Sequence, residues 1–200
     1  YDHSLAKGST YVAPCGGRRE RTRRGDDSLE NTPMDELNPR IVVMGPSGLG
    51  KTAVGAALAV DYGVDFVDAD DLHPAANVEK MEAGHPLDDD DRAPWLDVVG
   101  TTLADAPGLV VACSALARRY RDRIRAAAPD VRFVELVVSP EELDRRMRSR
   151  EHFMPPALLA SQLATLEHLA ADEPGIAVEN VGRILEVARR ARIALDAAQG

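Results

Sequence analysis

The chain has 200 residues, 44% of them hydrophobic and 28% charged, which suits one globular domain with a buried core. Its formal net charge of −9 excludes general attraction to nucleic acid and to acidic membranes. Two cysteines in no metal-ligand spacing, no apolar run of membrane-spanning length and no secretory leader predict a cytoplasmic protein.

Residues 1–38 differ from the rest of the chain. They are rich in glycine, charge and turn-forming residues and show no sustained helical or strand period. We expect a disordered N-terminal extension or tag here, with the natural domain beginning near Met34 and the folded domain spanning residues 39–200. The basic cluster at 18–24 is expected to be part of this tail and not a nucleic-acid arm.

From Arg40 onward, apolar runs alternate with helical segments. Near-continuous apolar strands separated by helices are typical of a parallel sheet covered on both faces, so the predicted fold class is α/β. Strands are expected at 40–44, 64–68, 109–113, 131–138 and 175–180, the last of them at a sheet edge. Helices are expected at 51–63, 114–128, 140–150 and 181–198.

The segment "GPSGLGKT" at 45–52 matches the phosphate-binding pattern G-x-x-x-x-G-K-[ST] and lies between a predicted strand and a predicted helix. Its glycines let backbone N–H groups converge on phosphate oxygens, and the helix dipole adds to the attraction. Lys51 is predicted to reach the β- and γ-phosphates, and Thr52 to ligate magnesium together with Asp68. The predicted ATP-binding residues are Gly45, Pro46, Ser47, Gly48, Leu49, Gly50, Lys51 and Thr52.

A GTPase switch and a small-molecule kinase both use such a loop. The switch is disfavoured because no asparagine begins an N-K-x-D motif and because "DAPG" at 105–108 precedes a strand instead of following one. A kinase needs an acceptor pocket and a cationic lid, which we predict at about 145–157. Arg146 and Arg150 are four residues apart on a predicted helix, so both can approach the transferring phosphoryl group, or they belong to a solvated charged helix.

Four segments in this order resemble the bacterial-type gluconokinases, small P-loop kinases related to shikimate and adenylate kinases. They are "GPSGLGKT", "DADDLHPAANVEKMEAGHPLDDDDRAPWL", "CSALARRYRDRIR" and "HFMPPALLASQLATLE", and the resemblance runs from Arg40 to the C-terminus. It implies transfer of the γ-phosphoryl group of ATP, with Mg²⁺, to the 6-hydroxyl of D-gluconate. It also implies a five-stranded parallel core and leaves a homodimer open.

Gluconate carries one carboxylate and a row of hydroxyls, so its pocket needs hydrogen-bonding groups and a cation. Asp70, two residues beyond Asp68, lies on the same side of the extended strand end and is predicted to accept the proton of the attacking hydroxyl or to orient it. His73 is predicted to bind another hydroxyl or to cap a helix that starts near Pro74. Arg92 is predicted to bind the carboxylate, with a salt bridge to a neighbouring aspartate as the alternative.

The other acidic residues of this block are expected to have a structural role. Residues 88–91 are predicted to form a solvated helix start, where negative charge is favourable. Trp95 is predicted to pack in the core in preference to forming a sugar platform.

The chain departs from the family pattern at two places. Ala117 stands where the family usually has lysine, so Arg118 and Arg121 are predicted as the substrate contacts of this helix. Glu151 replaces the usual glycine before "HF", and His152 is predicted to contact phosphate or substrate, or to pack structurally.

Two rival functions remain open at this stage. Shikimate kinase shares the D-x-D pattern and a basic lid, but "CSAL" replaces its glycine-rich substrate loop. A non-enzymatic P-loop regulator would retain nucleotide binding and lack an active lid. The preferred prediction is gluconokinase.

Overall fold

The computed structural model of the protein describes residues 38–148 and 156–198, all of which belong to the unit Thr32–Gly200. Except for Asn38, the predicted N-terminal extension lies outside the described residues. The central part of the predicted lid, residues 149–155, also lies outside them.

The core is a five-stranded sheet in which every neighbouring pair of strands is parallel. Its spatial order is β2-β3-β1-β4-β5, which confirms both the predicted parallel sheet and the edge position of the last strand. In the centre, Val42 lies opposite Val111 on one side and Phe133 on the other. The strands are β1 (Arg40–Met44), β2 (Asp65–Asp68), β3 (Leu109–Ala112), β4 (Arg132–Val137) and β5 (Gly175–Glu179).

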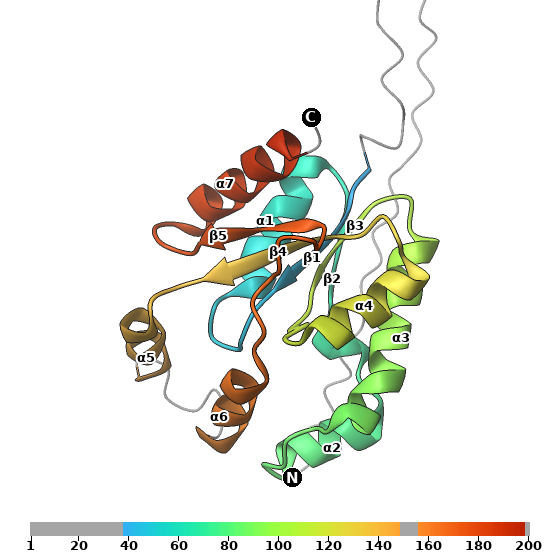
Figure 1. Cartoon of the computed structure of the whole chain (residues 1–200), viewed down its shortest axis with the longest axis vertical. Coiled ribbons are helices and arrows are strands. Elements are labelled where there is room, and N and C mark those ends of the chain that lie inside the picture. The colour runs from blue at the N-terminus through green and yellow to red at the C-terminus, as the bar shows by residue number, and fades with distance from the viewer. Residues whose placement is uncertain (1–37, 149–155, 199–200) are drawn as a thin grey trace, which may run out of the picture. The chain divides into compact units, whose positions relative to one another are not determined.

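Helices cover both faces of this sheet, as the continuous apolar strands require (Figure 1). Successive side chains of β1 point to opposite faces: Val43 packs with Leu58 of α1, whereas Val42 packs with Leu103 of α3. The helices α1 (Lys51–Tyr62) and α7 (Ile184–Ala197) cover one face, and α3 (Asp89–Asp105) and α4 (Arg118–Ala127) cover the other. None of the helices in the described ranges combines the length and apolar character that a bilayer crossing requires.

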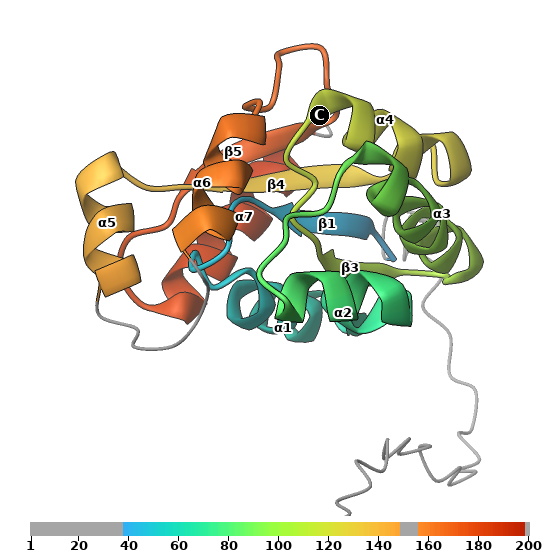
Figure 2. The same cartoon turned by 90° about the horizontal axis from the view of Figure 1, so that it is seen from below.

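The smaller elements follow the carboxyl ends of the strands. A short 3-10 turn, Ala69–Leu72, comes directly after β2 and leads into α2 (Ala75–Glu82), close to the helix start predicted near Pro74. Helices α5 (Pro140–Arg148) and α6 (Pro156–Thr165) follow β4. Figures 1 and 2 show α2 and α6 at the same end of this unit. In open parallel sheets this is the edge where ligands bind.

The start of α3 confirms the prediction for residues 88–91. The Asp88 carboxylate accepts a hydrogen bond from the Asp91 N–H at 2.9 Å, and the Asp91 carboxylate accepts one from the Asp88 N–H at 2.8 Å. Lys80 of α2 pairs with both carboxylates. This reciprocal cap satisfies backbone donors that a helix otherwise leaves open.

Candidate active site

The phosphate loop connects β1 to α1. Gly45, Gly48 and Gly50 have φ values of 132°, 87° and 78°, a region that favours glycine. A Cβ atom on Gly45 would lie 3.2 Å from the backbone oxygen of Leu136, so the loop also needs glycine there for space. Gly50 caps α1 without a side-chain hydrogen bond, and no acidic residue lies in the first turn. The first N–H groups of α1 are therefore available to an anionic ligand.

Lys51 is half-buried beside this loop, and its Nζ donates to the carbonyl oxygen of Pro46 at 3.3 Å. Burial lowers the pKa of the Lys51 ammonium, while the negative charges of Asp70 and Asp68 act in the opposite direction. A partly desolvated ammonium interacts more strongly with an incoming phosphate than one in bulk water does.

Thr52 and Asp68, the predicted metal pair, are in direct contact. The Thr52 hydroxyl donates to Asp68 Oδ2 at 2.6 Å, and Asp68 Oδ1 accepts the N–H of Asp70 at 3.1 Å. Within residues 38–148 and 156–198, no group of three or more histidine, cysteine or acidic side chains could hold a metal. One hydroxyl and one carboxylate fit a hard divalent cation that completes its coordination with phosphate and water.

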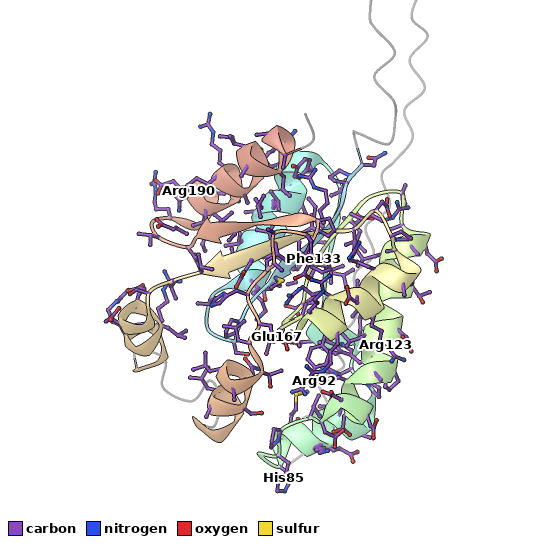
Figure 3. The ribbon with its side chains drawn as sticks, viewed as in Figure 1. His85, Arg92, Arg123, Phe133, Glu167 and Arg190 are labelled. Carbon is purple, nitrogen blue, oxygen red and sulfur yellow. The ribbon has the colours of Figure 1, made fainter. Side chains whose placement is uncertain are left out.

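A cavity of about 240 Å³ joins the phosphate loop to the acidic block. Ser47 and Lys51 line it from the loop, and Asp70, His73 and Arg92 line it from the block. Ser114, Leu116, Ser161 and Gln162 belong to the wall as well. Figure 3 shows Arg92 on the side of α3 nearest α6. The tertiary structure thus brings five of the predicted site residues into one cavity.

Asp70 has solvent-exposed surface in this cavity, yet protein atoms lie close around its carboxyl group. This desolvation raises the pKa of the Asp70 carboxyl, and the neighbouring Asp68 raises it further, whereas Lys51 lowers it. A carboxylate with a raised pKa holds a proton more readily than an ordinary one does.

His73 stacks on Trp95, with ring centroids 4.1 Å apart and an angle of 14° between the planes. Burial and the nearby Arg92 lower the pKa of His73 to about 4, so its ring is neutral at neutral pH. Trp95 is buried and donates from Nε1 to the Ala69 carbonyl at 2.7 Å, which confirms its predicted core position. It also supplies part of the cavity wall.

Arg92 is held by an aromatic partner. Its Nη1 donates to the Tyr120 hydroxyl at 3.1 Å, and the guanidinium carbon lies 5.4 Å from the centre of the Tyr120 ring. Tyr120 in turn donates to Asp89, which Arg119 also binds. Among the described residues no ion pair of Arg92 with its aspartate neighbours is found, so the alternative of a salt bridge there is not observed.

Of the two substrate contacts predicted on α4, the structure contradicts that of Arg121, whereas that of Arg118 stays a prediction. Arg121 is fully buried and pairs with Glu173 at 2.6 and 2.7 Å. Its remaining donors bind backbone carbonyls, among them that of Ala115 at 3.2 Å. Arg118 is absent from the cavity lining and pairs bidentately with Asp172 at 2.9 and 2.8 Å. Arg121 is therefore part of the core, whereas Arg118 forms an exposed ion pair.

Of the three lid side chains predicted to act in the reaction, Arg146, Arg150 and His152, only Arg146 belongs to the described residues. Arg150 and His152 lie outside the described residues, as does Glu151. Arg146 donates to Glu142 and to the carbonyl oxygen of Asn180, both at 2.6 Å. The Asn180 amide then donates to the carbonyl oxygen of Leu49 in the phosphate loop at 2.5 Å. Arg146 is therefore linked to the loop through one intermediate residue, and its catalytic role remains a prediction.

Sequence reasoning missed several polar residues at the site, among them Tyr120 and Gln162. Tyr120 holds Arg92, and Gln162 of α6 hydrogen-bonds Ser47 of the phosphate loop. Gln162 lies within the quoted segment "HFMPPALLASQLATLE", but nothing in its spacing indicates a partner 115 residues earlier.

The fold and the cavity define a small-molecule P-loop kinase. A sequence family described as an AAA domain matches residues 41–169. The gluconokinase of Gluconobacter oxydans is 50% identical over 148 residues, which are 71% of this chain and 83% of that protein. The chain belongs to the gluconokinase family and is therefore an ATP-dependent phosphotransferase; such kinases generally use a divalent metal.

Solved structures agree with this assignment. The crystal structure of a gluconokinase from Sinorhizobium meliloti 1021 superposes with a TM-score of 0.75 at 43% identity, covering 81% of this chain and 94% of that one. Shikimate kinase from Aquifex aeolicus, at 15% identity and a TM-score of 0.55, covers 80% of this chain and 98% of its own. The second likeness concerns the fold alone.

Proposed function

We propose that the chain transfers the γ-phosphoryl group of Mg·ATP to the 6-hydroxyl of D-gluconate, giving 6-phospho-D-gluconate and ADP. The observation that carries this proposal is the shared cavity, where Ser47 and Lys51 of the phosphate loop meet Asp70 and Arg92. A phosphoryl donor and a polyhydroxylated acid can therefore lie next to each other in a space lined by complementary groups.

Each acceptor-binding role matches the chemistry of its side chain. Arg92 binds the gluconate carboxylate, because its planar fork offers parallel N–H donors and Tyr120 holds it in place. His73 is neutral, so one ring nitrogen donates and the other accepts, which suits a sugar hydroxyl. Asp70 takes the 6-hydroxyl, since it lines the cavity and its carboxylate interacts electrostatically with Lys51 of the phosphate loop.

The metal is proposed to be Mg²⁺, with the Thr52 hydroxyl and the Asp68 carboxylate as its protein ligands. Thr52 and Asp68 would hold the ion, which would supply positive charge to offset the negative charge of the phosphates during transfer. The carboxylate of Asp68 also accepts the N–H of Asp70, so the metal pair and the acceptor-binding carboxylate share one short segment of backbone.

In the transfer step, the 6-hydroxyl oxygen forms a bond to the γ-phosphorus while the bond to the β–γ bridging oxygen breaks. ADP leaves with that electron pair, and the hydroxyl proton passes to the Asp70 carboxylate or, when Asp70 only orients the hydroxyl, to solvent. The transition state is loose, so holding the two substrates in line matters more than removing the proton early. Lys51 offsets the negative charge on the phosphates.

We further propose that residues 39–200 form the kinase domain and that about 145–157 act as its lid. Arg146, Arg150 and His152 would then approach the phosphates from the lid side. Two observations support the lid. The segment runs from the last turn of α5 to the first turn of α6, and Arg146 is already linked through Asn180 to the phosphate loop.

The assembly and location of the protein belong to the same proposal. We propose a homodimer, which the family resemblance leaves open, and light scattering of the purified chain would test it. A cytoplasmic location is proposed from the low cysteine content, and fractionation of cells that express the chain would test it.

A coupled ADP-release assay tests the reaction directly. Mg·ATP is supplied with D-gluconate, other sugar acids, shikimate or nucleoside monophosphates, each at the same concentration. Turnover that gluconate alone stimulates is the expected result. Stimulation by another acceptor would contradict the substrate assignment, and ATP binding without any stimulated turnover would favour a regulatory protein.

A further inference from the structure

Gln162 of α6 forms two hydrogen bonds with Ser47 in the phosphate loop. The Ser47 backbone N–H donates to Gln162 Oε1 at 2.7 Å, and Gln162 Nε2 donates to the Ser47 hydroxyl oxygen at 3.1 Å. Both ends of the carboxamide are thus used by one residue of the loop. A two-point contact fixes orientation as well as distance.

The segment that follows Gln162 is fixed to the core of the protein. The N–H of Glu167 donates to the Leu116 carbonyl at 2.8 Å, and the N–H of Leu169 donates to Glu135 Oε2 at 2.9 Å. Glu135 is only 2% exposed and lies on β4 in the sheet. Gln162 is therefore held at a defined position relative to the sheet, not carried on a free arm.

Ser47 is placed where its backbone affects the reaction. It lines the cavity together with Lys51 and Asp70, and Gln162 lines the same cavity. In a phosphate loop the backbone N–H groups are the donors that cradle the phosphates. Moving Ser47 therefore moves the cradle relative to Lys51 and to the acceptor hydroxyl.

We propose that Gln162 is a positioning residue for phosphoryl transfer, which acts by holding Ser47 so that the γ-phosphoryl group lies in line with the acceptor beside Asp70. This inference rests on the proposed function. Misplacement of reacting groups by about 1 Å costs on the order of 10²-fold in rate. The contribution of Gln162 should therefore appear in kcat more than in the binding of either substrate.

Gln162→Met tests this inference, because methionine keeps the length of the side chain and removes both hydrogen bonds. We expect kcat for gluconate phosphorylation to fall about 10- to 100-fold, with the KM values for ATP and gluconate changed by no more than about threefold. Leu163→Met is the matched control, since Leu163 is the next residue of α6 and is 42% exposed. The control should have the kcat and Tm of the wild type.

Gln162→Glu gives a second, different signature. The carboxylate can still accept from the Ser47 N–H and from its hydroxyl, so kcat should fall less than in Gln162→Met. Its negative charge faces the phosphates, so the KM for ATP should rise, and added salt should reduce that rise. A residue that only packs against the loop would not separate the two variants in this way.

Two results would overturn the inference. One is a kcat for Gln162→Met within about twofold of the wild type. The other is a parallel loss of kcat, both affinities and Tm, which indicates a general structural role.

Hydrolysis of ATP without an acceptor separates this inference from the proposed function. It also needs an aligned γ-phosphoryl group, so Gln162→Met should slow it by the same factor. If the wild type hydrolyses ATP but does not phosphorylate gluconate, the proposed substrate is wrong. The ATP hydrolysis rates of the wild type and Gln162→Met would still test the role of Gln162. A wild-type chain with neither activity would overturn both.

Discussion

Asp70 and Lys51 line one cavity, and the pKa of each is displaced in the direction that disfavours its charge. Burial raises the pKa of Asp70 and lowers that of Lys51, while each residue partly offsets the shift of the other. Such a pair is held in place by the fold at some cost to stability, and it interacts strongly with a charged ligand because water is partly excluded.

Replacing Asp70 with asparagine is expected to separate activity from stability. For Asp70→Asn we expect kcat to fall about 10²- to 10⁴-fold in the ADP-release assay, since the proton acceptor is lost. The pKa of Asp70 is raised in the folded state, so its charge destabilises the fold above the unfolded pKa. Asp70→Asn should therefore have a higher Tm at pH 7, and this gain should disappear below the unfolded pKa, where both states are protonated.

The control for this change is Asp71→Asn, because Asp71 is an exposed neighbour that does not line the cavity. In the wild type, kcat/KM for gluconate should fall as the pH drops through the raised pKa of Asp70. Near-normal turnover of Asp70→Asn would show that Asp70 neither accepts the proton nor orients the hydroxyl.

Replacing Arg92 with lysine is expected to change gluconate binding selectively. For Arg92→Lys the charge remains but the two parallel donors and the contact with Tyr120 are lost. Loss of a hydrogen bond to a charged group costs about 1.5–3 kcal/mol, so the KM for gluconate should rise about 10- to 100-fold. The KM for ATP should stay unchanged. Arg123→Lys on α4, where Arg123 pairs with the exposed Asp97, is the control, and an equal effect there would contradict the assignment.

The first turn of α3 connects helix capping to the acceptor site. Asp88 caps the helix, Arg92 follows one turn later, and Trp95 comes at the end of the second turn. The cap determines where the helix begins, and the helical repeat then determines which side chains reach the cavity. A surface cap and the proposed substrate contact of Arg92 are thus parts of the same element.

Removing the cap should cost stability. Asp88→Ala removes the acceptor for the Asp91 N–H and one partner of Lys80, and we expect a loss of about 1 kcal/mol in the free energy of unfolding. Urea denaturation followed by circular dichroism would measure it as a lower midpoint at an unchanged m value. Asp90→Ala, in the same exposed turn, should lower the midpoint by only a few tenths of the shift caused by Asp88→Ala. Equal effects of the two variants would show that charge near the helix start matters and the cap does not.

At the level of the whole molecule, Arg121 joins α4 to the chain that leads from α6 to β5. It pairs with Glu173 in the interior and donates to the carbonyl oxygens of Ala115, Leu116, Glu167 and His168. Ala115 has a φ of 40°, which an alanine adopts only when its surroundings hold it there. Because Ser114 and Leu116 on either side line the cavity, this buried pair also shapes the active site.

Replacing Arg121 with methionine should destabilise the whole domain. For Arg121→Met, Glu173 is left buried without its cation, and the expected loss is about 3–5 kcal/mol in the free energy of unfolding. Arg123→Met is the control on the same helix, since its exposed ion pair with Asp97 is worth at most about 1 kcal/mol. A loss no larger than that of the control would show that the buried pair contributes little.

The pH dependence of stability gives an independent check of the Arg121–Glu173 pair. Arg121 lowers the pKa of Glu173 in the folded state. The pair therefore contributes to the free energy of unfolding above the unfolded pKa of Glu173, and this stabilisation is lost as the pH falls through the lower folded pKa. The double variant Arg121→Met/Glu173→Met should lack this acid-dependent loss, as measured by Tm between pH 7 and pH 3.

The fold was predictable from the sequence because its signals are local. Each strand is a short apolar run, the phosphate loop has fixed glycine positions, and the residues 88–91 form a cap within four positions of one another. The proximity of Thr52, Asp68 and Asp70 was also predictable, since a parallel sheet brings the carboxyl ends of β1 and β2 to one edge. Arg121 was mispredicted because its exposure depends on Glu173, which lies 52 residues away.

The sequence alone determined the α/β class, the phosphate loop and the family, all of which depend on residue order and short-range periodicity. Only the tertiary structure decided which arginines reach the cavity and which are buried: Arg92 lines it, whereas Arg121 lies in the core. It also revealed the contact between Gln162 and Ser47. The physical reason is that a side chain's burial and partners depend on packing between distant segments, which no local pattern encodes.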